Sequence, residues 1–123
     1  MTYRVLIVDD NTSFLDAARA LLEREGLRVA GVASTAAEAR RRAVELRPDV
    51  VLVDITLGRE SGFELARRLA GHARDGEPAM ILISTHAEAD FADLIAESPA
   101  AGFLPKSELS ADAIRRILDG RSR

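Results

Sequence analysis

The chain has 123 residues, a length that fits one domain of ordinary size, and we expect residues 1–123 to form that domain. Hydrophobic residues make up 47% of it and charged residues 30%, and no stretch approaches the roughly 20 apolar residues of a membrane span. No secretory signal and no cysteine are found, so disulfides are excluded and we expect a cytosolic protein, while the net charge of −3 disfavours nucleic acid as a direct partner.

The first half of the chain carries three strand signals separated by two helix signals. An apolar run predicts a strand at residues 3–8, followed by a helix from about residue 12 to 25 that Gly26 ends. A weaker strand at 29–33 leads to a second helix, which begins at a capping box of Thr35 and Glu38 and ends before Pro48. Residues 50–53 form a continuous run of valine and leucine, typical of a buried parallel strand.

The second half continues the alternation. A polar loop separates the third strand from a short helix at 63–70, and residues 80–83 form the fourth strand. An alanine-rich helix at 89–97 precedes a short fifth strand at 102–104, and the last helix is capped by Ser110 and ended by Gly120. Strands that alternate with helices five times predict an α/β fold with a parallel sheet covered on both faces.

Three carboxylates follow two of the predicted strands. Asp9 and Asp10 come where the first strand stops, and Asp54 comes where the third stops. In open α/β sheets the carboxyl ends of the strands form the ligand-binding edge. Acids that converge there without a cation would repel one another and raise their pKa values. The pattern therefore predicts a metal and phosphoryl site, with Mg²⁺ as the ion because it prefers oxygen ligands.

The strand order decides whether these acids can meet, because only neighbouring strands bring their ends within reach of one ion. The order 2-1-3-4-5 makes the first and third strands adjacent, whereas a dinucleotide-binding order separates them. The acids therefore favour a flavodoxin-like, doubly wound (βα)5 fold with a five-stranded parallel sheet. No glycine-rich phosphate loop follows the first strand, so nucleotide binding is not indicated.

A hydroxyl and an ammonium complete the predicted site. Ser84 ends the fourth strand and Lys106 follows the fifth, so both reach the same edge as the acids. Asp10 and Asp54 could hold Mg²⁺ together with a backbone carbonyl just past Asp54, and Asp54 could act as nucleophile and form an acyl phosphate. Ser84 could donate to one phosphoryl oxygen and Lys106 could pair with another.

These motifs resemble, from Val5 to about Leu118, the response regulator receiver domain of two-component systems. The residues that carry the resemblance are Asp9-Asp10, Val51-Leu52-Val53-Asp54, Gly62, Ser84 and Phe103-Leu104-Pro105-Lys106. The resemblance implies that Asp54 is the phosphoacceptor and that Asp9, Asp10 and the Thr56 carbonyl serve the Mg²⁺. It further implies that Ser84 is a switch hydroxyl, that Lys106 binds the phosphoryl group, and that a sensor histidine kinase donates it.

The chain also departs from the family pattern. Gly58 stands where many receivers have proline, and we expect it to loosen that loop. Phe103 occupies the position of the family's rotating aromatic residue, without a hydroxyl. Thr56, Thr85 and His86 occupy the positions that tune the lifetime of the phosphoryl group in the family. Thr85 is bulkier than usual there, and we predict slow self-dephosphorylation.

The resemblance implies a two-state switch in which Ser84 and then Phe103 move inward. The surface of the last two strand-helix units would change and would serve a homodimer or an effector. Its charged residues are Asp90, Asp93, Glu108, Arg115 and Arg116. We expect either a stand-alone regulator or a receiver from a longer protein.

Other readings stay open at this point. Asp10 or Asn11 could simply cap the following helix. A degenerate receiver could serve only as a dimerisation module. A haloacid dehalogenase phosphatase needs D-x-D after the first strand, where this chain has Asn11 two positions after Asp9. A flavin carrier of the same fold would need hydrogen-bond donors where the acids stand.

Overall fold

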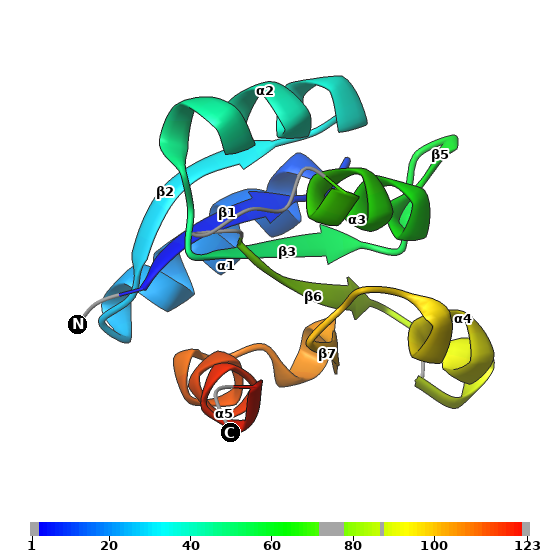
Figure 1. Ribbon diagram of the computed structural model, residues 1–123. Helices are drawn as coiled ribbons and strands as arrows, with labels where there is room; N and C mark the ends of the chain where they lie inside the picture. Colours follow the sequence, from blue (N-terminus) through cyan, green and yellow to red (C-terminus); the bar gives the residue numbers. More distant parts are fainter. Residues whose placement is uncertain (1–2, 72–77, 87, 122–123) are drawn as a thin grey trace.

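The computed structural model describes residues 3–71, 78–86 and 88–121 (Figure 1). Five parallel strands form its main sheet, in the order β2-β1-β3-β6-β7. These strands are β1 (Arg4–Val8), β2 (Arg28–Ala33), β3 (Val50–Asp54), β6 (Ala79–Ser84) and β7 (Gly102–Pro105). The predicted flavodoxin-like order 2-1-3-4-5 is confirmed, and it makes β1 and β3 neighbours.

Helices cover both faces of this sheet, and Figure 1 shows α2 and α3 on one side and α1 and α5 on the other. The helices are α1 (Thr12–Arg24), α2 (Ala36–Leu46), α3 (Gly62–Gly71), α4 (Ala92–Glu97) and α5 (Ala111–Arg121). The side chains of Asn11 and Ser110 accept N–H bonds in the first turns of α1 and α5. The prediction that Gly120 ends the last helix is wrong, because α5 continues to Arg121.

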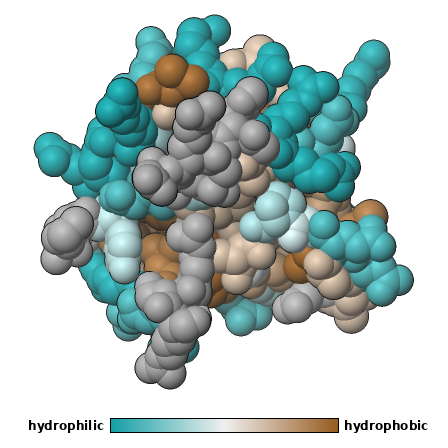
Figure 2. All heavy atoms as spheres, viewed as in Figure 1, coloured by the Kyte–Doolittle hydropathy of each residue, from teal (hydrophilic) through white to brown (hydrophobic). Residues whose placement is uncertain are grey.

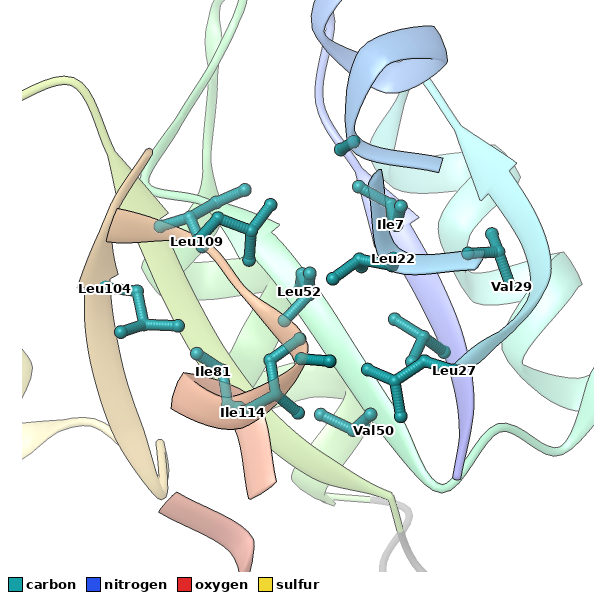
Figure 3. Close-up of a cluster of buried hydrophobic side chains, with 14 of the residues drawn as sticks. Ile7, Leu22, Leu27, Val29, Val50, Leu52, Ile81, Leu104, Leu109 and Ile114 are labelled. Atoms are coloured by element: carbon teal, nitrogen blue, oxygen red, sulfur yellow. The ribbon is translucent and has the colours of Figure 1, made fainter. Parts of the chain in front are cut away.

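The hydrophobic core consists of two clusters, one on each face of the sheet. The first lies between the sheet and helices α1 and α5 and includes Ile7, Leu22, Leu52, Ile81 and Ile114 (Figure 3). The second lies under α2 and α3 and includes Leu6, Val53, Leu65, Leu82 and Phe103. Alternate residues of each strand enter opposite clusters, so β3 and β6 are buried along their whole length.

The segment before β7 docks less firmly than the other helices. A 3₁₀ turn, η1 (Glu88–Phe91), comes before α4, where a single helix from residue 89 was predicted. No residue of α4 is fully buried, and the segment reaches the second cluster through the half-buried Phe91 and Ile95. Low burial predicts that this unit moves more easily than the rest of the fold.

A small hairpin occupies the polar loop predicted after β3. Strands β4 (Thr56–Leu57) and β5 (Glu60–Ser61) pair antiparallel around Gly58 and Arg59. Gly58 has a φ of 61°, and Arg47 is the one non-glycine residue of positive φ in the described ranges, so Arg59 has a negative φ. This is the pattern of a type II′ turn, in which glycine takes the first central position. The loop that contains Gly58 therefore forms a short β-hairpin.

In the view of Figure 2, hydrophilic residues lie mainly along the top and sides, and more hydrophobic residues gather through the centre and lower right. Val44 and Leu94 are the large exposed hydrophobic residues of the described ranges, and they belong to different helices. Among these ranges, no helix has both the length and the apolar character to cross a membrane.

Candidate functional site

The predicted site residues gather at the carboxyl edge of the sheet. Asp9 follows β1, Asp54 ends β3, Ser84 ends β6 and Lys106 follows β7. The register brings these ends together, since Val8 pairs with Val53, Asp54 with Ile83, and Ser84 with Pro105. The topology explains why residues nearly a hundred positions apart meet: parallel strands all end at one edge, and four neighbouring strands each contribute one polar group.

The acids form a compact cluster. One carboxylate oxygen from each of Asp9, Asp10 and Asp54 can be chosen so that all three lie within 4.8 Å of one another. Asp9 is fully buried and Asp54 is 6% exposed, whereas Asp10 is open to solvent. The donor set therefore fits Mg²⁺, which takes carboxylate and carbonyl oxygens, and the exposed Asp10 gives an ion access to the two buried acids.

Lys106 is the cation of the cluster. Its Nζ lies 2.5 Å from Oδ2 of Asp9 and 3.0 Å from Oδ2 of Asp54. The same ammonium lies 4.4 Å from the ring centroid of Phe14 on α1, a distance at which a cation is attracted to the face of an aromatic ring. The sequence does not reveal this contact, because it joins two separate elements. One ammonium among three carboxylates leaves the site negative and therefore attractive to a divalent ion.

The pKa values of Asp9 and Lys106 both differ from their ordinary values. Loss of water raises the pKa of the Asp9 carboxyl, and the charge of Asp54 adds to the rise, although Lys106 and the Asn11 N–H oppose it. Burial alone would lower the pKa of Lys106, but hydrogen bonds and charges from Asp9 and Asp54 outweigh it, so the pKa of Lys106 is raised. Lys106 is therefore cationic at neutral pH, whereas ionisation of Asp9 is less favourable than it would be in water.

The backbone around Asp54 is tightly constrained. The Thr56 N–H donates to Oδ1 of Asp54 at 3.0 Å, and the Gly62 N–H donates to the carbonyl of Ile55 at 3.0 Å. A Cβ atom built on Gly62 would lie 1.9 Å from the carbonyl oxygen of Asp54, which no side chain could accept. Glycine at position 62 is therefore required by the close approach of two backbone segments, and it lets α3 begin directly beside the acid.

Ser84 and its neighbours form a second part of the site. The Ser84 side chain is buried, and its Oγ accepts the His86 N–H at 2.9 Å and lies 3.4 Å from Nδ1 of the same residue. Thr85 and His86 are exposed, and the His86 ring packs edge-on against Phe91 at 5.8 Å. Phe103 is 9% exposed and lies in the second core cluster. The strand end of Ser84 is thus linked through His86 to the weakly docked η1.

Comparison with known proteins agrees with this geometry. A model of the response regulator receiver domain family matches residues 5–119. The response regulator GacA of Pseudomonas viridiflava is 31% identical over 115 residues, which are 93% of this chain and 53% of that protein. The transcriptional regulatory protein LiaR of Bacillus subtilis is 32% identical over 121 residues, or 95% of this chain and 56% of LiaR. The chain spans about half the length of these curated relatives.

Solved structures show the same fold. The receiver domain of the response regulator NarL from Mycobacterium tuberculosis superposes with a TM-score of 0.81 at 27% identity, covering 96% of this chain and 94% of that one. A CheY-like receiver domain from Methanospirillum hungatei gives a TM-score of 0.80 at 28% identity, covering 98% and 94%. Both likenesses extend over nearly the whole of each chain.

Proposed function

The chain belongs to the response regulator receiver domain family, and from that premise we propose that Asp54 accepts a phosphoryl group from a sensor histidine kinase. The observation that carries the proposal is the Asp54 carboxylate itself, which lies beside Lys106 and within 4.8 Å of oxygens from Asp9 and Asp10. The phosphorylated state then controls a partner or an output domain. The domain acts as a phosphoacceptor in signalling and catalyses only its own phosphorylation and dephosphorylation, and a cytosolic location fits this role.

The chemistry assigns one task to each side chain. An oxygen of Asp54 bonds to phosphorus as the bond from phosphorus to the kinase imidazole nitrogen breaks, and the imidazole leaves with the electron pair. Lys106, already 3.0 Å from Asp54, pairs with one phosphoryl oxygen. Ser84 accepts the His86 backbone N–H and keeps a hydroxyl proton, which it can donate to a second phosphoryl oxygen.

The acids fit a resident Mg²⁺. Asp9, Asp10, Asp54 and the Thr56 carbonyl would hold it, and when bound the ion supplies positive charge that neutralises the developing phosphoryl oxygens. Asp9 supports this assignment, because a fully buried carboxylate with a raised pKa gains most from a nearby cation. Thr56, Thr85 and His86 are exposed around the site, where they could restrict the approach of water and give slow self-dephosphorylation.

We assign the conformational response to the last two strand-helix units. Phe103 is already buried in the cluster that Phe91 and Ile95 partly join, so the switch repacks this ring against η1 and α4 when Ser84 turns to the phosphoryl group. The charged residues of this surface, which would meet a second copy or an effector, are Asp90, Asp93, Glu108, Arg115 and Arg116.

Intact mass after incubation with acetyl phosphate tests the proposal. We expect a gain of one phosphoryl group that requires Mg²⁺ and is lost in Asp54→Asn. No gain in the wild type would favour the alternative of a receiver that acts only as a phosphorylation-independent dimerisation module. A gain that persists in Asp54→Asn would move the nucleophile to Asp9 or Asp10 and would reopen the phosphatase reading.

A further inference from the structure

The β4-β5 hairpin connects the acid cluster to helix α2. Its turn residue Gly58 lies beside Asp10, since a Cβ atom built on it would be 3.6 Å from Oδ2 of that acid. Its first strand begins at Thr56, whose N–H binds the Asp54 carboxylate. Its second strand ends at Ser61, directly before the Gly62 contact with the backbone of Asp54. The hairpin therefore carries the backbone that borders the acids.

The hairpin contains two residue pairs, Thr56 with Ser61 and Leu57 with Glu60, and the buried Leu57 joins it to the second core cluster. An isolated two-stranded hairpin is marginally stable in water, so one of this size needs an anchor outside itself. Leu57 anchors the first strand, and Glu60 provides the anchor of the second strand: its Oε1 accepts the backbone N–H of Ala36 at 3.0 Å, across 24 positions of sequence.

The backbone N–H groups at the start of α2 are bonded by side chains, and Glu60 supplies one of these bonds. The Thr35 side chain accepts the Glu38 N–H at 3.1 Å, and the Glu38 carboxylate accepts the Ser34 N–H at 2.8 Å. The N–H of Ala36, the first residue of the helix, finds its partner in Glu60. A carboxylate at a helix N-terminus also gains from the helix dipole, which strengthens this bond relative to a neutral one.

We propose that Glu60 is a positioning residue for the cation site. By fixing β5 to the first turn of α2, it holds residues 56–58, including the Thr56 carbonyl, in place beside Asp10 and Asp54. This inference rests on the proposed function, because it concerns the Mg²⁺ that the acids would hold. By linkage, an ion in the site must affect the Glu60 bond as much as the bond affects the ion.

Glu64 provides a matched control for Glu60. Both carboxylates line one surface cleft with Ala36, Arg59, Ser61 and Arg68. Glu64 pairs with Arg68 at 3.0 Å along α3, and both of these side chains are about half exposed. Removing either glutamate changes the charge of the cleft equally, so a difference between the two variants reports the Ala36 bond and not the charge.

Isothermal titration with Mg²⁺ on the wild type, Glu60→Ala, Glu60→Gln and Glu64→Ala tests the proposal. We expect Glu60→Ala to bind Mg²⁺ about three- to tenfold more weakly than Glu64→Ala, as the loss of one charge-assisted hydrogen bond predicts. Glu60→Gln should recover most of the affinity, because its amide oxygen can accept the same N–H. Equal dissociation constants for Glu60→Ala and Glu64→Ala would overturn the inference, whereas a wild type that binds no Mg²⁺ would overturn the proposed function with it.

The amide of Ala36 provides a second readout that separates positioning from folding. Its NMR resonance should shift on addition of Mg²⁺ in the wild type and in Glu60→Gln, and it should not respond in Glu60→Ala. Thermal unfolding of the metal-free Glu60→Ala and Glu64→Ala proteins should occur at similar temperatures, since both side chains are exposed. An Ala36 amide that is insensitive to Mg²⁺ in the wild type, while the amides of residues 54–58 respond, would contradict the proposal.

Discussion

Lys106 shares one ammonium between two acids that are almost completely withdrawn from water. The surroundings of Asp9 and Asp54 are negative, because Asp10 adds a third carboxylate close enough to share one metal ion with them. Burial raises the pKa of Asp9, which means that its ionised form is less favourable in the folded protein than in the unfolded chain. In the metal-free protein, the buried charge of Asp9 therefore lowers the free energy of unfolding, and a bound cation would reduce this loss.

Replacing Asp9 by asparagine should therefore stabilise the metal-free protein at neutral pH. A carboxyl whose folded pKa is raised contributes stability below its unfolded pKa of 3.8 and loses it as the pH rises through the folded value. The advantage of Asp9→Asn in free energy of unfolding should accordingly grow as the pH rises from about 4 and then level off. Urea denaturation across this range measures it, with the exposed Asp16→Asn as the control for loss of one charge. An advantage that is independent of pH would contradict this account of Asp9.

Two glycines set the position of the acid loop: Gly62 packs tightly against the Asp54 backbone, and Gly58 forms the turn of the hairpin. These glycines meet different demands, since Gly62 needs the space of a missing side chain and Gly58 needs a positive φ. Helix α4, by contrast, is held by half-buried residues alone. The fold therefore combines a firmly fixed acid cluster with a loosely docked unit beside it, an arrangement that suits the switch we propose.

Gly62→Ala should destabilise the protein by about 1–3 kcal/mol or more, because its Cβ would meet the Asp54 carbonyl and force the backbone apart. Gly120→Ala is the matched control, since nothing lies within 4 Å of a Cβ at that helical position. This second change should stabilise α5 by up to about 1 kcal/mol through helix propensity. Chemical denaturation of both variants checks the pair, and equal effects would show that the Gly62 contact imposes no constraint.

Gly58→Pro places at the hairpin turn the residue that many receivers have there. Proline fixes φ near −65°, whereas Gly58 has a φ of 61°, so the substitution should break the type II′ turn and cost more than about 1 kcal/mol. Mg²⁺ affinity should fall with it, because the turn borders Asp10. A Gly58→Pro protein as stable as the wild type, with unchanged affinity, would show that the hairpin is not needed.

The parts of the fold that could be predicted from sequence are those that appear as continuous runs of apolar residues. The run Val50 to Val53 is typical of a buried strand, and acids at the ends of two such strands favour a sheet order that makes the strands neighbours. The meeting of Asp9, Asp54 and Lys106 follows from that order alone.

The features that escaped prediction depend on contacts between distant segments or on very short elements. Strands of two residues, as in β4 and β5, are too short to show a period, and Gly58 is typical of a turn without specifying its type. The hydrogen bond between the Ala36 N–H and Glu60 and the contact of the Lys106 ammonium with the Phe14 ring join separate elements, so no local sequence pattern indicates them. Glycine often ends helices, so the sequence predicts a stop at Gly120, yet the helix continues through it to Arg121.

The location of the phosphoryl group on the chain tests the central claim most directly. After phosphorylation with acetyl phosphate and Mg²⁺, borohydride reduction converts an aspartyl phosphate to homoserine, which peptide mass spectrometry can place in the sequence. The account predicts homoserine at position 54 and unmodified aspartate at positions 9 and 10. Homoserine at position 9 or 10, or none at position 54 in a protein that has gained a phosphoryl group, would contradict it.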